Sequence, residues 1–421
     1  MTKPRPTEPT TDARSPAAPR LGPRPLPLHV AIQVMTWMSS RAALPSLKSG
    51  SRPWRPELET RVRELAAALD EVEPEAFARA VDGQARRRMG DFARGVGAYH
   101  RHPYARAACE PNCLWSEGST RLLDYGDKGM GGGAPVLVVP SLINRAYILD
   151  LAEGRSLLRF LAGAGFRPLL VDWGAPDARE RCFSLGDYIA GPLERALAVA
   201  RRLRGGAVDV IGYCMGGLLA VALAARRPKD VRSLVTLAAP WDFHAAGMAK
   251  ASLLRTAAPH LRDLVRVLGA LPVDLIQALF ASLDPYGTAE KFRRFARLDP
   301  AHQRARLFVV LEDWLNDGVP LAGPAAIECL IGWYVENQPA LGTWRVAGEA
   351  VIAGDVRART LVVVPERDRI VPPASAQALA AAIPGAQCRV VAAGHIGMVA
   401  GASAASVLYR PLADWLGRTA A

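Results

Sequence analysis

The chain has 421 residues, of which 50% are hydrophobic and 22% are charged, so it can bury a large core and is not disordered throughout. Its 37 glycines and 33 prolines follow no repeat, and its six cysteines are sparse, which excludes collagen-like and disulfide-scaffold proteins. The formal net charge of +12 comes almost entirely from arginine. It indicates either a compositional bias or affinity for an acidic molecule, and no nucleic-acid-binding motif accompanies it.

The cysteines indicate a reducing, cytoplasmic setting, because they are few and show no disulfide framework. Cys109 and Cys113 lie four residues apart, but no second ligand pair follows at zinc spacing, so we expect no metal site. Residues 25–40 are apolar and uncharged, yet they follow a charged, proline-rich leader without a cleavage site. Neither a secretory signal nor a transmembrane segment is expected.

The first quarter of the chain contains a leader and a helical segment. Residues 1–26 are rich in Pro, Thr and Arg without periodicity, which predicts a disordered leader. Residues 27–110 contain apolar side chains at helical spacing, such as Val62, Leu65 and Leu69. We therefore expect an N-terminal helical extension.

The rest of the chain has the sequence pattern of an α/β protein. Residues 111–242 and 351–421 alternate short aliphatic runs with helical patterns, which predicts a mostly parallel central sheet flanked by helices. A strand pair is expected near 114–125. The further strands are expected at 136–139, 168–172, 208–211, 234–238, 360–364 and 389–392, with helices near 153–164, 187–204, 215–227, 374–382 and 403–417.

One interval breaks this alternation. Residues 243–350 contain helical patterns and no convincing strand. Ligands of open α/β sheets bind outside the carboxyl ends of the strands, where an insertion of this size can lie across the site. We therefore expect a helical cap insertion between two strands of the core.

The most informative motif is a G-x-C-x-G turn between an aliphatic strand and a helix, centred on Cys214. Such a turn is so tight that Gly212 and Gly216 are needed to avoid collisions, and it presents the central residue above the sheet at a helix N-terminus. Backbone N–H groups there stabilise a thiolate and an oxyanion. The alternative is a buried structural cysteine. The flanking elements favour a nucleophile.

An acid and a base are expected after the nucleophile in the chain. Asp368 follows a predicted strand, and His395 lies in a glycine-flanked loop after the last one. An imidazole there can act as the base, with the carboxylate holding its tautomer. Glu366 is the rival acid. Alternatively, Asp368 caps the helix that begins near Ala374, and His395 is an exposed loop residue.

An oxyanion hole needs two N–H donors. Met215 supplies one by its position after the nucleophile. The second is expected from the loop after the first parallel strand, at Leu142 or, as a close rival, Ile143. An ordinary strand–helix turn is the alternative for this loop.

These motifs together resemble those of polyhydroxyalkanoate synthases, α/β-hydrolase-superfamily enzymes with Cys in place of the usual nucleophilic Ser. The resemblance covers roughly residues 115–242 and 358–417. The matching segments are G-Y-C-M-G-G at 212–217, V-P-S-L-I-N-R-A-Y-I-L-D at 139–150, D-W-G-A-P at 172–176, D-Y-I at 187–189, D-R-I-V-P at 368–372 and G-H-I-G at 394–397.

The resemblance implies an acyltransferase that polymerises (R)-3-hydroxyacyl-coenzyme A into polyester and releases coenzyme A. Cys214 would carry the growing chain and His395 would be the base. Asp368 would support His395 or activate the incoming hydroxyl. No cofactor is implied, because coenzyme A arrives with the substrate. A cytoplasmic, granule-associated enzyme is expected, acting as a homodimer or with a partner subunit.

Some residues depart from the family pattern. Leu142 stands where the family usually has an aromatic residue or Cys, and Arg369 where it has His.

The alternatives to a polymerase are a thioesterase or intracellular polyester hydrolase on the same core, or a catalytically silent granule-associated protein. The apolar run at 25–40 indicates contact with a granule surface or a partner, unless it is buried against the core.

Overall fold

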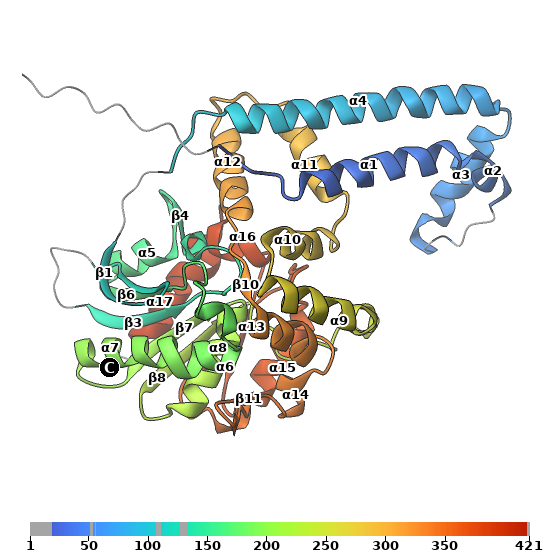
Figure 1. The fold of residues 1–421 in the computed structure, drawn as a ribbon. Helices are drawn as coiled ribbons and strands as arrows, with labels where there is room; N and C mark the ends of the chain where they lie inside the picture. Colours follow the sequence, from blue (N-terminus) through green and yellow to red (C-terminus); the bar gives the residue numbers. More distant parts are fainter. Residues whose placement is uncertain (1–18, 51–53, 55, 107–110, 127–132, 419–421) are drawn as a thin grey trace, which may run out of the picture.

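An eight-stranded sheet forms the centre of the computed structural model, which describes residues 19–50, 54, 56–106, 111–126 and 133–418 (Figure 1). The strand order is β1-β2-β6-β3-β7-β8-β13-β14. The β1–β2 and β2–β6 pairs are antiparallel and the other five neighbouring pairs are parallel, which gives the mostly parallel sheet that the sequence predicts. The strands are β1 (Asn112–Glu117), β2 (Thr120–Asp124), β3 (Ala134–Val139), β6 (Phe166–Asp172), β7 (Val208–Tyr213), β8 (Val231–Leu237), β13 (Arg359–Pro365) and β14 (Gln387–Val391).

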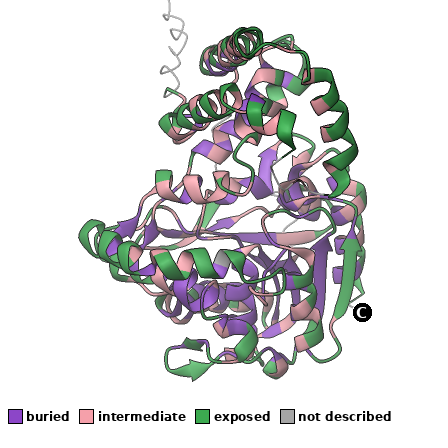
Figure 2. Cartoon of the chain, turned by 90° about the vertical axis from the view of Figure 1, so that its right-hand side faces the viewer, coloured by how far each residue is buried: buried purple, intermediate pink, exposed green. Residues whose placement is uncertain are grey.

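Both faces of the sheet are buried, which explains why its parallel strands are continuous aliphatic runs. Leu137 and Val139 of β3 contribute to one hydrophobic cluster, whereas Val136 and Val138 contribute to the other. This division follows the two-residue side-chain period of a strand. The purple, buried residues in Figure 2 accordingly concentrate in the sheet and the helices against it.

Helices cover both faces of the sheet (Figure 1). On one side lie α6 (Leu185–Tyr188), α7 (Glu194–Arg204), α8 (Met215–Arg226) and α15 (Pro373–Ala382). On the other lie α5 (Leu157–Gly163), α16 (His395–Ala400) and α17 (Arg410–Gly417). Two π-helical turns, η4 (Ile189–Leu193) and η7 (Ala405–Tyr409), precede α7 and α17.

The interval 243–350 adds no strand to the central sheet within the described part of the chain. It also contains two short strand pairs that the sequence analysis missed, β9 (Ala270–Leu271) with β10 (Leu321–Ala322) and β11 (Arg345–Val346) with β12 (Glu349–Ala350). Pairs of two residues carry too little periodicity to detect. Its helices are α9 (Ala249–Leu268), α10 (Val273–Ala281), α11 (Gly287–Phe295), α12 (Gln303–Asn316), α13 (Gly323–Ile327), the π-helical η5 (Glu328–Trp333) and α14 (Gln338–Leu341).

An N-terminal arm, residues 26–101, projects beyond the sheet (Figure 1). It consists of α1 (Leu26–Arg41), α2 (Leu44–Ser49), α3 (Glu59–Leu69) and α4 (Pro74–Arg101). Helix α1, which holds most of the apolar run, packs against α4 and α11 rather than against the sheet. A small cluster that includes Phe92, Tyr99, Phe292 and Val309 joins the arm to α11 and α12.

The expectation of a disordered leader over residues 1–26 is wrong for its last part. Residues 1–18 lie outside the described residues, but Arg20 donates a 2.7 Å hydrogen bond to Asp313 and another of 2.7 Å to the His102 carbonyl. These partners are distant in sequence, so composition could not reveal them. Among the described residues, no helix is long and apolar enough to cross a membrane.

Candidate active site

Cys214 lies on the turn between β7 and α8, where its backbone is strained. Its φ of 56° and ψ of −127° are rare for a residue with a side chain. A Cβ on Gly216 would lie 2.2 Å from the Val139 carbonyl oxygen, and one on Gly212 would lie 2.5 Å from the Gly216 oxygen. Only glycine lets these backbones approach so closely. The turn thus places the half-buried Cys214 thiol at the N-terminus of α8, as the motif predicts.

His395 and Asp368 come together beside Cys214. The imidazole Nδ1 lies 2.6 Å from an Asp368 carboxylate oxygen, and both side chains are almost completely buried. The His395 ring also lies close enough to Cys214 for the charge of Cys214 to raise the pKa of the imidazole. Because Nδ1 faces the carboxylate, Nε2 is the nitrogen available to the thiol. His395 is the first residue of α16, so the loop expected around it is instead a helix start.

The charges around His395 favour its protonated form. Burial lowers the pKa of the imidazole, but the charge of Cys214, the hydrogen bond with Asp368 and the charge of Asp368 outweigh it and raise the pKa to about 10. A thiolate next to a protonated imidazole is the reactive form of a cysteine nucleophile. The arrangement therefore suits attack on an acyl carbonyl.

The Asp368 carboxylate is held by the backbone of its own loop. Its other oxygen accepts hydrogen bonds from the N–H groups of Ile370, at 2.8 Å, and Val371, at 2.9 Å. It does not cap α15, whose N-cap residue Pro372 has no side-chain hydrogen bond. The rival acid Glu366 is half exposed and pairs with Arg367. Asp368 is thus the acid that contacts the imidazole.

The two candidate oxyanion donors lie on elements that meet closely. The loop after β3 reaches the start of α8, since a Cβ on Gly216 would also meet the Pro140 carbonyl oxygen at 2.5 Å. Met215 begins α8, where an N–H group has no partner within the helix. The rival donor Ile143 is engaged, because its N–H donates a 3.0 Å bond to the Ser141 hydroxyl. This leaves Leu142, which is buried, as the candidate of the loop.

Three further side chains surround Cys214, and the sequence analysis assigned none of them. Burial and the nearby Cys214 raise the pKa of the Cys329 thiol to about 12, and they raise that of Tyr213 well above its usual value. Burial, Cys329 and Cys214 likewise raise the pKa of Tyr334. Cys329 and Tyr334 belong to the segment 328–334 of the expected cap. Only Tyr213, next to the nucleophile, could have been found from the motif.

Comparisons with known proteins find a matching family model and several sequence relatives. The family model described as alpha/beta hydrolase fold matches residues 134–402. The poly(3-hydroxyalkanoate) polymerase subunit of Haloarcula marismortui is 29% identical over 72% of this chain and 66% of its own length. The corresponding subunit of Haloferax mediterranei is 29% identical over 72% of this chain and 62% of its own length. That of Allochromatium vinosum is 29% identical over 67% of this chain and 80% of its own length.

The chain therefore spans slightly less than two thirds of the first two relatives and four fifths of the third. The family model covers well over half of the chain and includes the segments that contain Cys214, Asp368 and His395. These matches confirm the resemblance found in the motifs. The chain belongs to the α/β hydrolase fold family, in which its sequence relatives are the poly(3-hydroxyalkanoate) polymerase subunits.

Proposed function

We propose that this chain is an acyltransferase that polymerises (R)-3-hydroxyacyl-coenzyme A into polyester and releases coenzyme A. The observation that carries the proposal is the contact of a buried His395–Asp368 pair with a cysteine nucleophile in an elbow. The names of the sequence relatives support the polymer as the product. The assignment of catalytic roles to Cys214, His395 and Asp368 is part of the proposal.

In the first step, the Cys214 thiolate attacks the thioester carbonyl of the substrate. The oxyanion that forms is stabilised by the N–H groups of Met215 and Leu142. The carbon–sulfur bond to coenzyme A breaks, and the leaving thiolate takes the proton from His395. The acyl group now forms a thioester with Cys214, and this exchange between similar bonds keeps it ready for transfer.

In the second step, the hydroxyl of another hydroxyacyl-coenzyme A attacks the Cys214 thioester. His395 removes the hydroxyl proton as the new ester bond forms, and the thiolate of Cys214 is released. The lengthened acyl-coenzyme A then returns to Cys214, and coenzyme A leaves again. No cofactor takes part, because coenzyme A is brought by the substrate.

The hydrogen bonds of Asp368 support a role in positioning. One carboxylate oxygen contacts the His395 ring, and the other is engaged by two backbone N–H groups. Neither oxygen is therefore left to take a proton from an incoming hydroxyl. Asp368 holds the imidazole with Nε2 toward Cys214 and stabilises the imidazolium that the first step consumes and the second step forms again.

A polymerase must also keep water from the acyl-enzyme, since water would hydrolyse the thioester. Cys329 and Trp333, from the segment above the site, are buried, and Cys329 lies near Cys214. We propose that the interval 243–350 is a cap that excludes water and admits the hydroxyacyl substrate. Association with a polyester granule, and with a second copy or a partner subunit, belongs to the same proposal, because the relatives are named as subunits.

The test is to incubate the purified chain with 3-hydroxybutyryl-coenzyme A and to measure three products: coenzyme A, free 3-hydroxybutyrate and polymer. Polymer formed together with coenzyme A supports the proposal. Free hydroxy acid without polymer would instead identify a thioesterase or polyester hydrolase. Mass spectrometry of the Cys214 peptide completes the test, because a chain that never becomes acylated there is not an acyltransferase of this mechanism.

A further inference from the structure

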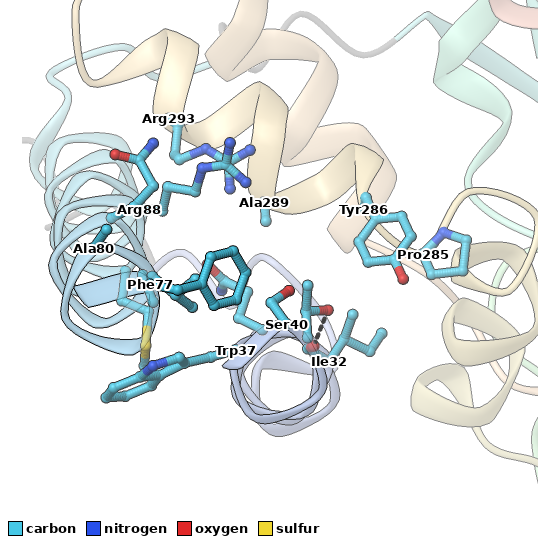
Figure 3. A pocket seen from close by; sticks show the side chains of 16 residues that line it. Ile32, Trp37, Ser40, Phe77, Ala80, Arg88, Pro285, Tyr286, Ala289 and Arg293 are labelled. Carbon is cyan, nitrogen blue, oxygen red and sulfur yellow. Dashed lines mark hydrogen bonds between the residues drawn. The ribbon is translucent and has the colours of Figure 1, made fainter. Parts of the chain in front are cut away.

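The N-terminal arm and α11 enclose a groove at a distance from the catalytic triad. It has a volume of about 490 Å³ and is lined by α1, α4 and the segment 285–293. Figure 3 shows that Ile32, Trp37 and Phe77 line its lower part in that view. Met89 also belongs to the apolar lining. The volume is that of a site for a small molecule, and apolar walls favour an apolar ligand.

Two arginines that form no ion pair with any described residue lie at one end of this groove. The side chains of Arg88, from α4, and Arg293, from α11, lie next to each other in Figure 3. Neither forms an ion pair or hydrogen bond with any residue that the structure describes. Burial and the neighbouring Arg88 lower the pKa of Arg293, and the opposing charges of Glu290 and Asp91 do not outweigh them. Two adjacent cations of this kind repel each other unless an anion lies between them.

The surroundings of the pair remain positive. A polar hollow next to the groove is lined by Arg87, Arg88, Arg293, Arg294 and Arg297, but by only two carboxylates. Those carboxylates are already engaged, Glu290 with Arg294 and Asp91 with Arg94 and Arg297. Both carboxylates also act on Arg293 through their charge, but their ion pairs are with other arginines, and five arginines face these two carboxylates in the hollow.

We propose that this groove binds a single acyl chain that ends in an anionic head group. The chain lies against Ile32, Trp37 and Phe77, and the head group lies between Arg88 and Arg293. Guanidinium groups bind carboxylates and phosphates through paired, charge-assisted hydrogen bonds. The site is separate from the triad, and the proposal does not depend on the polymerase activity.

Other occupants fit the groove less well. Residues 1–18 contain one large apolar side chain, Met1, so this segment of the chain cannot supply an acyl-like apolar run. A second copy of the chain carries the same net charge of +12 and would bring more positive charge to the arginines. A small anionic amphiphile satisfies both the apolar walls and the charged end.

The test is isothermal titration calorimetry of the full-length chain with four probes that share a twelve-carbon chain, each below its critical micelle concentration. Dodecanoate and dodecyl phosphate are expected to bind, and the tighter of the two identifies the head group. Dodecanol and dodecyltrimethylammonium are expected to bind at least about tenfold more weakly. Equal binding of the cationic probe, or no binding of either anion, would overturn the proposal.

Matched variants locate the site. Arg88→Gln and Arg293→Gln are each expected to weaken dodecanoate binding by about five- to tenfold. Arg79→Gln is the control, because Arg79 lies on the same helix, is exposed and pairs with Glu75 outside the groove. An Arg79→Gln variant that loses binding as much as Arg88→Gln would reduce the effect to general surface charge and contradict the site.

A second pair of variants tests the apolar part of the groove. Ala80→Trp fills the groove and is expected to abolish binding of dodecanoate, whereas Ala76→Trp, on the same helix but outside the groove, is not. Circular dichroism checks that both variants are folded. Sedimentation of the wild-type chain, with and without dodecanoate, tests the rival occupant. A dimer that Ala80→Trp dissociates, and that dodecanoate does not affect, would assign the groove to a second copy instead.

Discussion

The catalytic core and the N-terminal arm use apolar residues in opposite ways. In α8, which follows the nucleophile, ten of the twelve residues from Met215 to Arg226 are buried. In α1, one residue of sixteen, His29, is buried, and Met35 and Met38 are more than 60% exposed. The core buries its apolar side chains, whereas the arm leaves part of its apolar surface exposed to solvent. The arm therefore presents apolar side chains that the core would bury.

The largest expected effect on activity is in the core, at Cys214, the proposed nucleophile. Cys214→Ala is expected to lower coenzyme A release by at least about 10⁴-fold, because loss of a covalent nucleophile leaves only the oxyanion donors and binding. The measurement is a steady-state assay with 3-hydroxybutyryl-coenzyme A. Cys182→Ala and Cys388→Ala are the controls, since both residues are exposed. A Cys214→Ala variant with wild-type activity would remove the catalytic role of the elbow.

The next effect concerns the carboxylate behind the base. Asp368→Asn keeps an oxygen for the backbone N–H groups of Ile370 and Val371 but loses the charge next to His395. We expect a 10²–10⁴-fold lower kcat, on the order found when a base loses its orienting acid. Glu366→Gln, at the exposed rival, should change kcat less than about twofold. Equal losses in both variants would contradict the assignment.

A histidine in the core and one in the arm should change the stability of the protein in opposite directions as the pH rises. His395, in the core, has a pKa raised to about 10, so the folded state binds its proton more tightly than the unfolded chain does. Its contribution to stability is present below about pH 6.5 and is lost as the pH rises toward 10. One pKa unit corresponds to about 1.4 kcal/mol, so the loss is on the order of a few kcal/mol.

In the arm, burial lowers the pKa of His29, so its contribution is lost as the pH falls below about 6.5. Urea unfolding at about pH 5, 7 and 10 measures both effects. His395→Gln should remove the alkaline decline, and His29→Gln the acidic one. A His395→Gln variant with the full alkaline decline would show that other groups cause it.

The smallest expected effects come from two glycines. Gly216→Ala would place a Cβ 2.2 Å from the Val139 carbonyl oxygen and should cost about 1–3 kcal/mol of stability. Gly83→Ala, inside α4, meets only the Arg87 side chain at 4.0 Å and should stabilise by about 0.5–1 kcal/mol, since alanine favours a helix. Urea unfolding measures both. If both variants changed the free energy of unfolding in the same direction, the contrast between a packed core and an open arm would be contradicted.

Much of the core could be predicted because its determinants are local. The strands are aliphatic runs with a side-chain period of two, and the G-x-C-x-G turn requires glycine wherever it occurs. The order of Cys214, Asp368 and His395 follows from strands that end at the same edge of the sheet. These features need only residues close in sequence.

Tertiary structure decided the features that depend on distant partners. It brought Cys329 and Tyr334 beside Cys214, and it bound Arg20 to Asp313 across almost 300 residues. It also started α16 at His395, where the sequence favoured a loop.

The groove with Arg88 and Arg293 has the same origin, since α4 and α11 lie about 200 residues apart. The sequence by itself determined the strand–turn–helix around Cys214, the placement of Asp368 and His395 after strands, and the sheet that presents them, because local periodicity and turn sterics specify these features. What lies above the site and the groove that the arm forms with α11 were decided by packing between segments that are distant in the sequence.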